Sequence, residues 1–270
     1  MSTVLQPDRT ITCNGVKVNQ YLLTLHNPFH IDMPTAQMNK VIGVTIHNTD
    51  WISVIQGSTP AEQYTRATVN GNMNDVRVHY YVDDKCAWQN LPLNRAGWHA
   101  ADGKGDGNRK TIAIECIMSP NYNGIDQASE LNAARLAAYL LHEYNLDINH
   151  LYTHTHWLNV KDGKRGDVDF LNTDHNYYKD CPFYILPHWN DFKEKVQDYL
   201  NELNNGNEIE HSDELVYLKK GTPIFPNAGA NTRMSGIIKT SCKYTIVERR
   251  SAYGVNWGRL KSNKGWVKLK

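Results

Sequence analysis

The chain has 270 residues, of which 40% are hydrophobic and 21% are charged, with a net charge of +1 and a mean hydropathy of −0.58. This composition is typical of a soluble protein, and no apolar run approaches the roughly 20 residues of a membrane-spanning helix. The length accommodates one good-sized domain and a small one.

Strands and helices alternate in the first 200 residues. The predicted elements, in chain order, are a buried strand over 41–46 that ends at His47, a helix from Pro60 to Thr68 capped by Thr59, β segments over 76–82 and 86–91, a central strand over 111–118, a buried helix from about Gln127 to Asn145, and a last helix beginning near Pro187. This order predicts an α/β domain with a mixed sheet flanked by helices.

The composition changes after this part of the chain. A polar, Asn- and Glu-rich stretch predicts a linker, and short β segments separated by Gly, Asn and Ser turns then predict a small all-β barrel. We therefore expect an α/β domain over 1–203, a linker over 204–214 and a barrel over 215–270.

Charge is distributed unevenly between these parts. Residues 215–270 contain 12 Lys or Arg and one acid, a net +11, whereas the rest contains 17 basic and 27 acidic residues, a net −10. A basic module joined to an acidic one predicts an anionic partner. Charge alone does not decide whether this partner is a cell-wall polymer, a nucleic acid or a lipid.

Two features bear on the compartment. The five cysteines are odd in number and lack a Cys-x-x-Cys pair, which indicates folding in a reducing compartment rather than a disulfide framework. The N-terminus lacks the basic and apolar regions of a signal peptide. We expect synthesis in the cytoplasm, and a target outside the cell would need another route of release.

Three residues far apart in the sequence, His47, His154 and Cys181, have local contexts that suit a zinc ligand. Zinc binds neutral imidazole and thiolate, and a catalytic site keeps three protein ligands so that water takes the fourth position. Without further context His47 could be a structural histidine and Cys181 an inert buried thiol. If His154 lies on a strand, His156 faces the same side and could bind instead. His175 is a weaker rival.

Six short stretches of the sequence resemble those of the type 2 N-acetylmuramoyl-L-alanine amidases, and they occur in the same order as in that family. These amidases are zinc enzymes of phage lysins and bacterial wall turnover, and they share the fold of peptidoglycan-recognition proteins. The matching stretches are 45–49, 79–83, 93–100, Asn108 with 111–115, 153–157 and 179–182, which together span roughly residues 40–190.

The resemblance implies roles for individual residues. His47, His154 and Cys181 would bind one zinc ion, with His154 favoured over His156 by the His-x-x-Trp register. Glu115 matches the catalytic glutamate. Lys179 matches a cation that polarises the scissile carbonyl or stabilises its oxyanion, although it could be an ordinary solvated lysine. His99 and His79 are candidates for substrate contact, with structural packing as an equal alternative.

The chain departs from the family pattern at two places. Val78 stands where some relatives have a tyrosine, so the acid–base chemistry would fall on Glu115. His154 and Cys181 are 27 residues apart, a longer gap than in many relatives. The extra stretch, 158–178, predicts a surface loop beside the cleft that could shape substrate choice.

The tail resembles bacterial SH3-type wall-binding domains, through Lys219–Thr222, Tyr244–Val247, Trp257–Ser262 and Gly265–Val267. Trp257 and Trp266 could belong to the core or face a ligand. Tyr217, Phe225 and Tyr253 are weak candidates for ligand contact.

These observations predict a phage endolysin of a Gram-positive host, made in the host cytoplasm and acting on the wall after release. Its zinc amidase would cut between N-acetylmuramic acid and L-alanine, and its barrel would bind peptidoglycan or an anionic wall polymer, with no nucleic-acid or membrane partner. The alternatives are a non-catalytic peptidoglycan-recognition protein and a zinc endopeptidase acting within the stem peptide. A nucleic-acid-binding barrel ranks lower, because interleaved surface aromatics are missing. The sequence does not indicate the oligomeric state.

Overall fold

The computed structural model describes residues 4–163, 180–204, 214–226, 228, 234–252, 255–262 and 264–269. They form two compact units, Met1–Asn204 and Asn205–Lys270. Outside the described residues lie Lys179, Tyr253, residues 164–178 of the insertion, which include His175, and the stretch 205–213 of the expected linker. The first part of the insertion, 158–161, is helical, with Leu158 and Asn159 buried, so the surface loop predicted for the whole of 158–178 is wrong there.

The first unit is built on a seven-stranded mixed sheet in the order β1-β2-β5-β4-β6-β3-β7. Its strands are β1 (Arg9–Cys13), β2 (Val16–Gln20), β3 (Gly43–Asp50), β4 (Tyr80–Val82), β5 (Ala87–Gln89), β6 (Thr111–Met118) and β7 (Leu151–Thr153). Strands β4, β6, β3 and β7 run parallel to one another, whereas β1–β2 and β5–β4 are antiparallel pairs. The α/β fold with a mixed sheet that the sequence predicted is confirmed.

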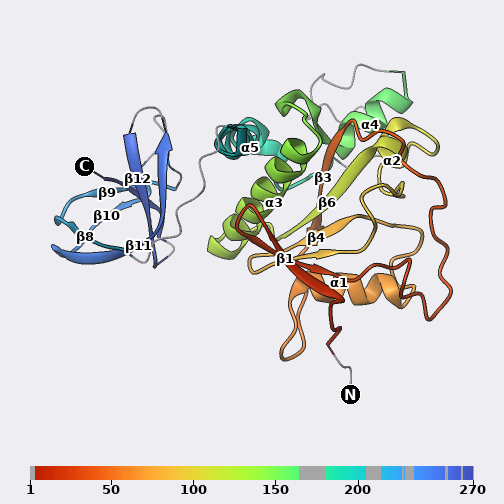
Figure 1. Cartoon of the computed structure of the whole chain (residues 1–270), viewed down its shortest axis with the longest axis horizontal. Helices are drawn as coiled ribbons and strands as arrows, with labels where there is room; N and C mark the ends of the chain where they lie inside the picture. Colours follow the sequence, from red (N-terminus) through yellow and green to blue (C-terminus); the bar gives the residue numbers. More distant parts are fainter. Residues whose placement is uncertain are drawn as a thin grey trace. The chain divides into compact units, whose positions relative to one another are not determined.

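Helices cover both faces of this sheet (Figure 1). They are α1 (Pro60–Val69), α2 (Asp106–Lys110), α3 (Gly124–Glu143), α4 (His154–Lys161) and α5 (Trp189–Asn204), with short 3-10 turns at Ile148–His150 and Leu186–His188. Helices α3 and α5 pack together, with α3 on β6, whereas α1 lies against β4 and β5. Buried Glu130 of α3 binds His188 at 2.7 Å and Lys195 of α5 at 2.5 Å, which ties the two helices together.

Alternation along β3 and β6 divides the side chains between the two faces. Val44, Ile46 and Ile114 belong to the larger apolar cluster beneath α3 and α5. Ala113 and Ile117 belong to a second cluster with residues of α1. His47 and Glu115 alternate with the first set, so their side chains emerge on the α1 face.

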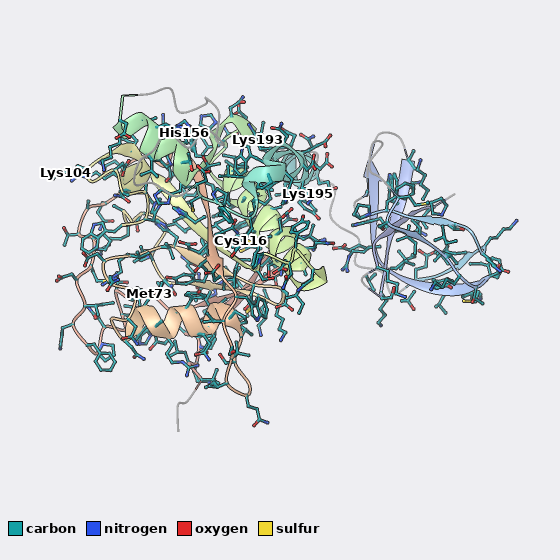
Figure 2. All side chains as sticks on the ribbon, turned by 180° about the vertical axis from the view of Figure 1, so that it is seen from behind. Met73, Lys104, Cys116, His156, Lys193 and Lys195 are labelled. Atoms are coloured by element: carbon teal, nitrogen blue, oxygen red, sulfur yellow. The ribbon has the colours of Figure 1, made fainter. Side chains whose placement is uncertain are left out.

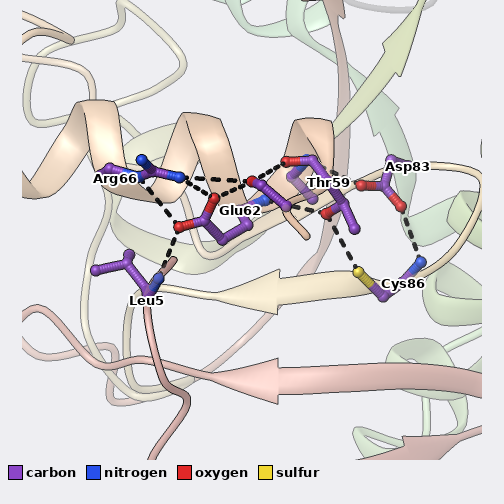
Figure 3. Close-up of polar contacts among 8 residues, drawn as sticks. Leu5, Thr59, Glu62, Arg66, Asp83 and Cys86 are labelled. Carbon is purple, nitrogen blue, oxygen red and sulfur yellow. Dashed lines mark hydrogen bonds and ion pairs between the residues drawn. The ribbon is translucent and has the colours of Figure 1, made fainter. Parts of the chain in front are cut away.

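The start of α1 is fixed by a buried polar network (Figure 3). Thr59 caps the helix by accepting from the backbone N of Glu62, and Asp83 accepts from the backbone N of Ala61 at 2.9 Å. Glu62 pairs with Arg66 and accepts from the backbone N of Leu5. The Thr59–Pro60 start that the sequence predicted is confirmed.

The second unit is a small all-β structure. Four antiparallel strands follow the order β13-β12-β11-β8, and β9 pairs with β10. The strands are β8 (Glu214–Leu218), β9 (Pro223–Ile224), β10 (Gly236–Ile237), β11 (Cys242–Ala252), β12 (Val255–Leu260) and β13 (Trp266–Lys268). Trp257 and Trp266 are 1% and 3% exposed, so both belong to the core, whereas Tyr217 is 59% exposed.

None of the helices in the described part of the chain is both long enough and apolar enough to cross a membrane.

Candidate metal centre

His47, His154 and Cys181 converge at the carboxyl end of the parallel strands. Their candidate ligand atoms all lie within 4.8 Å of one another. The His47 Nδ1 atom is 3.8 Å from the Cys181 Sγ atom, and the His47 and His154 ring centroids are 4.7 Å apart. Three residues separated by up to 134 positions in the sequence therefore form one cluster.

The donor set fits zinc. Tetrahedral zinc, with bonds of about 2.0–2.1 Å to imidazole and about 2.3 Å to thiolate, separates its ligand atoms by roughly 3.3–3.6 Å. The His47–Cys181 separation of 3.8 Å is close to this value, and all three ligand atoms lie within 4.8 Å of one another. Two imidazoles and one thiol leave a fourth position for water. His47 and Cys181 are 2% and 3% exposed, so the cluster is largely screened from bulk solvent.

His154 reaches the cluster from a helix rather than from a strand. Strand β7 ends at Thr153, whose side chain accepts from the His156 backbone N and caps α4, so His154 is the first helical residue. The assumption that His154 and His156 share one face of a strand is therefore wrong. The His156 ring lies on α4 against Tyr152 and Trp157, outside the cluster (Figure 2).

Glu115 lies beside the cluster. In the parallel pairing of β3 and β6 it is opposite His47, and in the pairing of β4 and β6 it is opposite Tyr81. Paired residues of neighbouring strands project from the same face. Burial and the nearby Glu115 carboxylate raise the pKa of Tyr81 well above its usual value, so this phenol stays protonated.

His99 contacts a candidate ligand directly. Its Nδ1 atom is 3.0 Å from the His47 Nε2 atom, and the residue is 7% exposed. Since His47 Nδ1 faces Cys181, the proton of a neutral His47 belongs on Nε2, where it can be donated to His99. Such a bond fixes the ring and the tautomer of a metal ligand. Contact between His99 and substrate stays a prediction.

The loop that carries His99 is held by Asn108. The Asn108 Oδ1 atom accepts from the backbone N atoms of His99 and Ala100, at 2.7 and 2.8 Å. At Gly97 a Cβ atom would come within 2.6 Å of the His99 ring, so a side chain there would displace it. Both Asn108 and Gly97 lie in the stretches that resemble the amidases, but no role was predicted for either residue from the sequence.

His79 is buried away from solvent. Its Nε2 atom donates to the Arg95 carbonyl at 2.8 Å, and its Nδ1 atom accepts from the Ala113 backbone N at 3.0 Å. Burial lowers the pKa of His79 to about 4, so the ring is neutral at physiological pH. With both nitrogens occupied and 0% exposure, this geometry favours the structural alternative over substrate contact.

Two further residues hold the segment that carries Cys181. Thr155 bonds to the backbone of Cys181, and Asn48 bonds to the backbone of Tyr184 and Ile185. Neither residue was predicted from the sequence. Their position directly after the two histidines is the signal that could have found them.

Comparison with known proteins identifies the segment that carries the cluster. The model of the N-acetylmuramoyl-L-alanine amidase family matches residues 37–182, which include His47, His154 and Cys181. The chain belongs to this family. The matched segment also carries Glu115 and His99, whereas the second unit lies outside it.

Several amidases and endolysins are similar to this amidase-family chain. It is 32% identical over 150 residues to the N-acetylmuramoyl-L-alanine amidase CwlH of Bacillus subtilis (strain 168), covering 55% of this chain but only 50% of CwlH. The structure of PlyL matches with a TM-score of 0.50 and 27% identity, covering 67% of this chain and 96% of PlyL. A mutant endolysin from Bacillus subtilis matches with the same score and identity, covering 66% and 99%.

Proposed function

We propose that the chain is a zinc-dependent amidase that hydrolyses the bond between N-acetylmuramic acid and L-alanine in peptidoglycan. The observation that carries this proposal is the convergence of His47, His154 and Cys181 beside Glu115, within the segment that matches the amidase family. The two imidazoles and the thiolate would hold the metal ion.

The residues around the metal position would divide the chemistry between them. Bound zinc lowers the pKa of water toward about 7 and polarises a carbonyl. Glu115, on the same face as His47, would accept the proton of the attacking water and return it to the leaving amine. His99 would keep His47 oriented with its Nδ1 lone pair toward the metal. We also propose Lys179 as the cation at the developing oxyanion, which such donors stabilise by about 3–4 kcal/mol.

Glu115 would be the acid–base group of the reaction. Val78, at the place where some relatives have a tyrosine, is fully buried. Tyr81 lies near Glu115, but it is 1% exposed and belongs to the second apolar cluster. Its hydroxyl is 3.2 Å from the hydroxyl of Thr68. The Glu115 carboxylate is half-buried next to the metal position, so it can reach substrate and water, whereas Val78 and Tyr81 are buried.

We propose that the second unit is an SH3-type wall-binding module. Residues 215–270 of this unit carry a net charge of +11, which suits a polymer bearing phosphates or carboxylates. Since both tryptophans are buried, exposed Tyr217 and half-buried Phe225 are better placed to contact a ligand. Similarity of the first unit to an endolysin supports lysis of a Gram-positive host as the biological setting.

The test is hydrolysis of purified peptidoglycan by the full chain. An amidase releases new L-alanine amino termini without new reducing sugars, and metal chelation abolishes the release. Mass spectrometry of the fragments separates this reaction from cleavage within the stem peptide. Metal-loaded protein that binds peptidoglycan without releasing amino termini would instead support the recognition-protein alternative.

A further inference from the structure

Thr155 holds the backbone of Cys181 on both sides of the Cys181 Cα atom. The Cys181 N–H donates to the Thr155 Oγ1 atom at 2.9 Å, and the Thr155 N–H donates to the Cys181 carbonyl at 3.0 Å. The Thr155 hydroxyl also lies 3.2 Å from this carbonyl, to which it can donate. Thr155 is 1% exposed, so these bonds are shielded from competing water.

Asn48 holds the same segment a few residues later. Its Oδ1 atom accepts from the backbone N atoms of Tyr184 and Ile185, at 3.0 and 3.2 Å. Its Nδ2 atom donates to the Cys116 carbonyl of β6 at 3.0 Å. The chain that leaves Cys181 is therefore fixed to the end of the central sheet.

The two contacts share one arrangement in the sequence. Asn48 directly follows His47, and Thr155 directly follows His154. Each candidate histidine ligand is thus covalently linked to a side chain that binds the backbone near the third ligand. A shift of either histidine would move the contact that holds Cys181.

We propose that Thr155 and Asn48 are positioning residues that preorganise the Cys181 thiolate, so that the metal affinity of the site depends on them. This inference rests on the proposed zinc binding. Metal–sulfur distances tolerate deviations of only about 0.2 Å, and a segment that must be ordered on binding lowers affinity by its ordering cost. Groups that orient metal ligands typically change metal affinity about 10–100-fold when they are removed.

Thr155→Val is the sharpest variant for testing this role. Valine keeps the shape of threonine but removes the oxygen that accepts from the Cys181 N–H, which leaves a buried donor without its partner. Thr155→Ser restores the oxygen. Thr65→Val is the matched control, because Thr65 is also fully buried and its hydroxyl binds Asn90, outside the ligand cluster, at 2.9 Å.

The experiment measures metal binding by the full-length protein rather than catalysis. Zinc affinity is obtained by competition with a chromophoric chelator, and cobalt loading reports sulfur ligation through the thiolate-to-cobalt absorption band. We expect Thr155→Val to lower zinc affinity about 10–100-fold and to weaken the band. Thr155→Ser and Thr65→Val should retain wild-type values. Asn48→Ala should also weaken binding.

Each outcome bears on the proposal. Unchanged affinity and cobalt spectrum in Thr155→Val, or equal losses in Thr155→Val and Thr65→Val, would overturn it. If Thr155→Val does not fold, Asn48→Ala decides, and wild-type affinity in that variant refutes the inference. A wild-type protein that binds neither metal would overturn the proposed zinc function itself, an outcome distinct from all of these.

Discussion

Glu115 lies opposite His47 in the parallel pairing of β6 and β3. A carboxylate and a candidate metal ligand are therefore held side by side by two central strands rather than by flexible loops. The register that brings them together is fixed by eight residue pairs, which join Gly43–Asp50 to Thr111–Met118. A slip of one residue would move one of the two side chains to the opposite face of the sheet.

This relationship predicts the phenotype of Glu115→Gln. The amide has nearly the same shape but cannot accept the proton of water, so kcat should fall about 10²–10⁴-fold. Zinc content should stay at the wild-type value, because Glu115 is outside the ligand set. Release of L-alanine amino termini, measured beside metal analysis, tests both points. Near-wild-type turnover would assign the acid–base chemistry to another residue.

Cys181→Ser should remove both metal and activity. A serine hydroxyl is a far weaker zinc ligand than a thiolate, so the purified variant should contain little zinc and release few amino termini. Cys242→Ser is the matched control, because Cys242 is an exposed free thiol of the second unit. Full zinc content and activity in Cys181→Ser would disprove the assignment of this ligand.

Elements of secondary structure with a short sequence signal, such as an apolar run or a helix cap, could be predicted from the sequence. The Thr59–Pro60 start of α1 has a direct counterpart in the structure. The apolar run before His47 lies in β3, but this strand spans Gly43–Asp50, so the predicted end of the strand at His47 is wrong. The hairpin β1–β2 was missed, although its turn contains Asn14-Gly15, with φ values of 47° and 78°, a strong hairpin signal. The short α2 was also missed.

The site was harder to predict wherever it depends on tertiary contacts. The family resemblance brought the three ligands together, but it did not indicate how they are held. The bond between His47 and His99 joins residues 52 positions apart, and the bonds from Thr155 to Cys181 join residues 26 apart. Helix and strand periodicity relates only residues that are close in the sequence, so it cannot predict contacts between residues this far apart. The helical start at His154 depends on the Thr153 cap, a signal that the strand interpretation overlooked.

The proposed wall-binding role of the second unit predicts a separable effect of Tyr217→Ala. Because Tyr217 is 59% exposed, its loss should weaken co-sedimentation with cell walls without unfolding the unit. Hydrolysis of soluble peptidoglycan fragments should be unaffected, because the substitution lies outside the amidase segment. Trp257→Ala should instead destabilise this unit, since that side chain is 1% exposed. Unchanged sedimentation of Tyr217→Ala would exclude this side chain from the binding surface.

His99→Leu should weaken metal binding while leaving all three ligands in place. Leucine cannot accept the His47 Nε2 proton, so the ring of His47 loses the contact that orients it. We expect zinc affinity to fall about 10–100-fold, as is common when the partner of a ligating histidine is removed. Chelator competition measures this change. An affinity equal to that of wild type, with activity alone reduced, would favour the direct substrate contact expected from the family resemblance.

His79 should make stability depend on pH. Its pKa is lowered by burial to about 4 in the folded protein, against 6.5 for the unfolded chain. Between these values the unfolded chain binds more protons, so stability is complete above about pH 6.5 and falls as the pH decreases toward 4. The loss from this group is at most about 3 kcal/mol. Denaturant unfolding of wild type and His79→Gln between pH 4 and 7 isolates its contribution, because the glutamine variant lacks the titrating group. Parallel pH profiles for the two proteins would show that His79 does not carry this dependence.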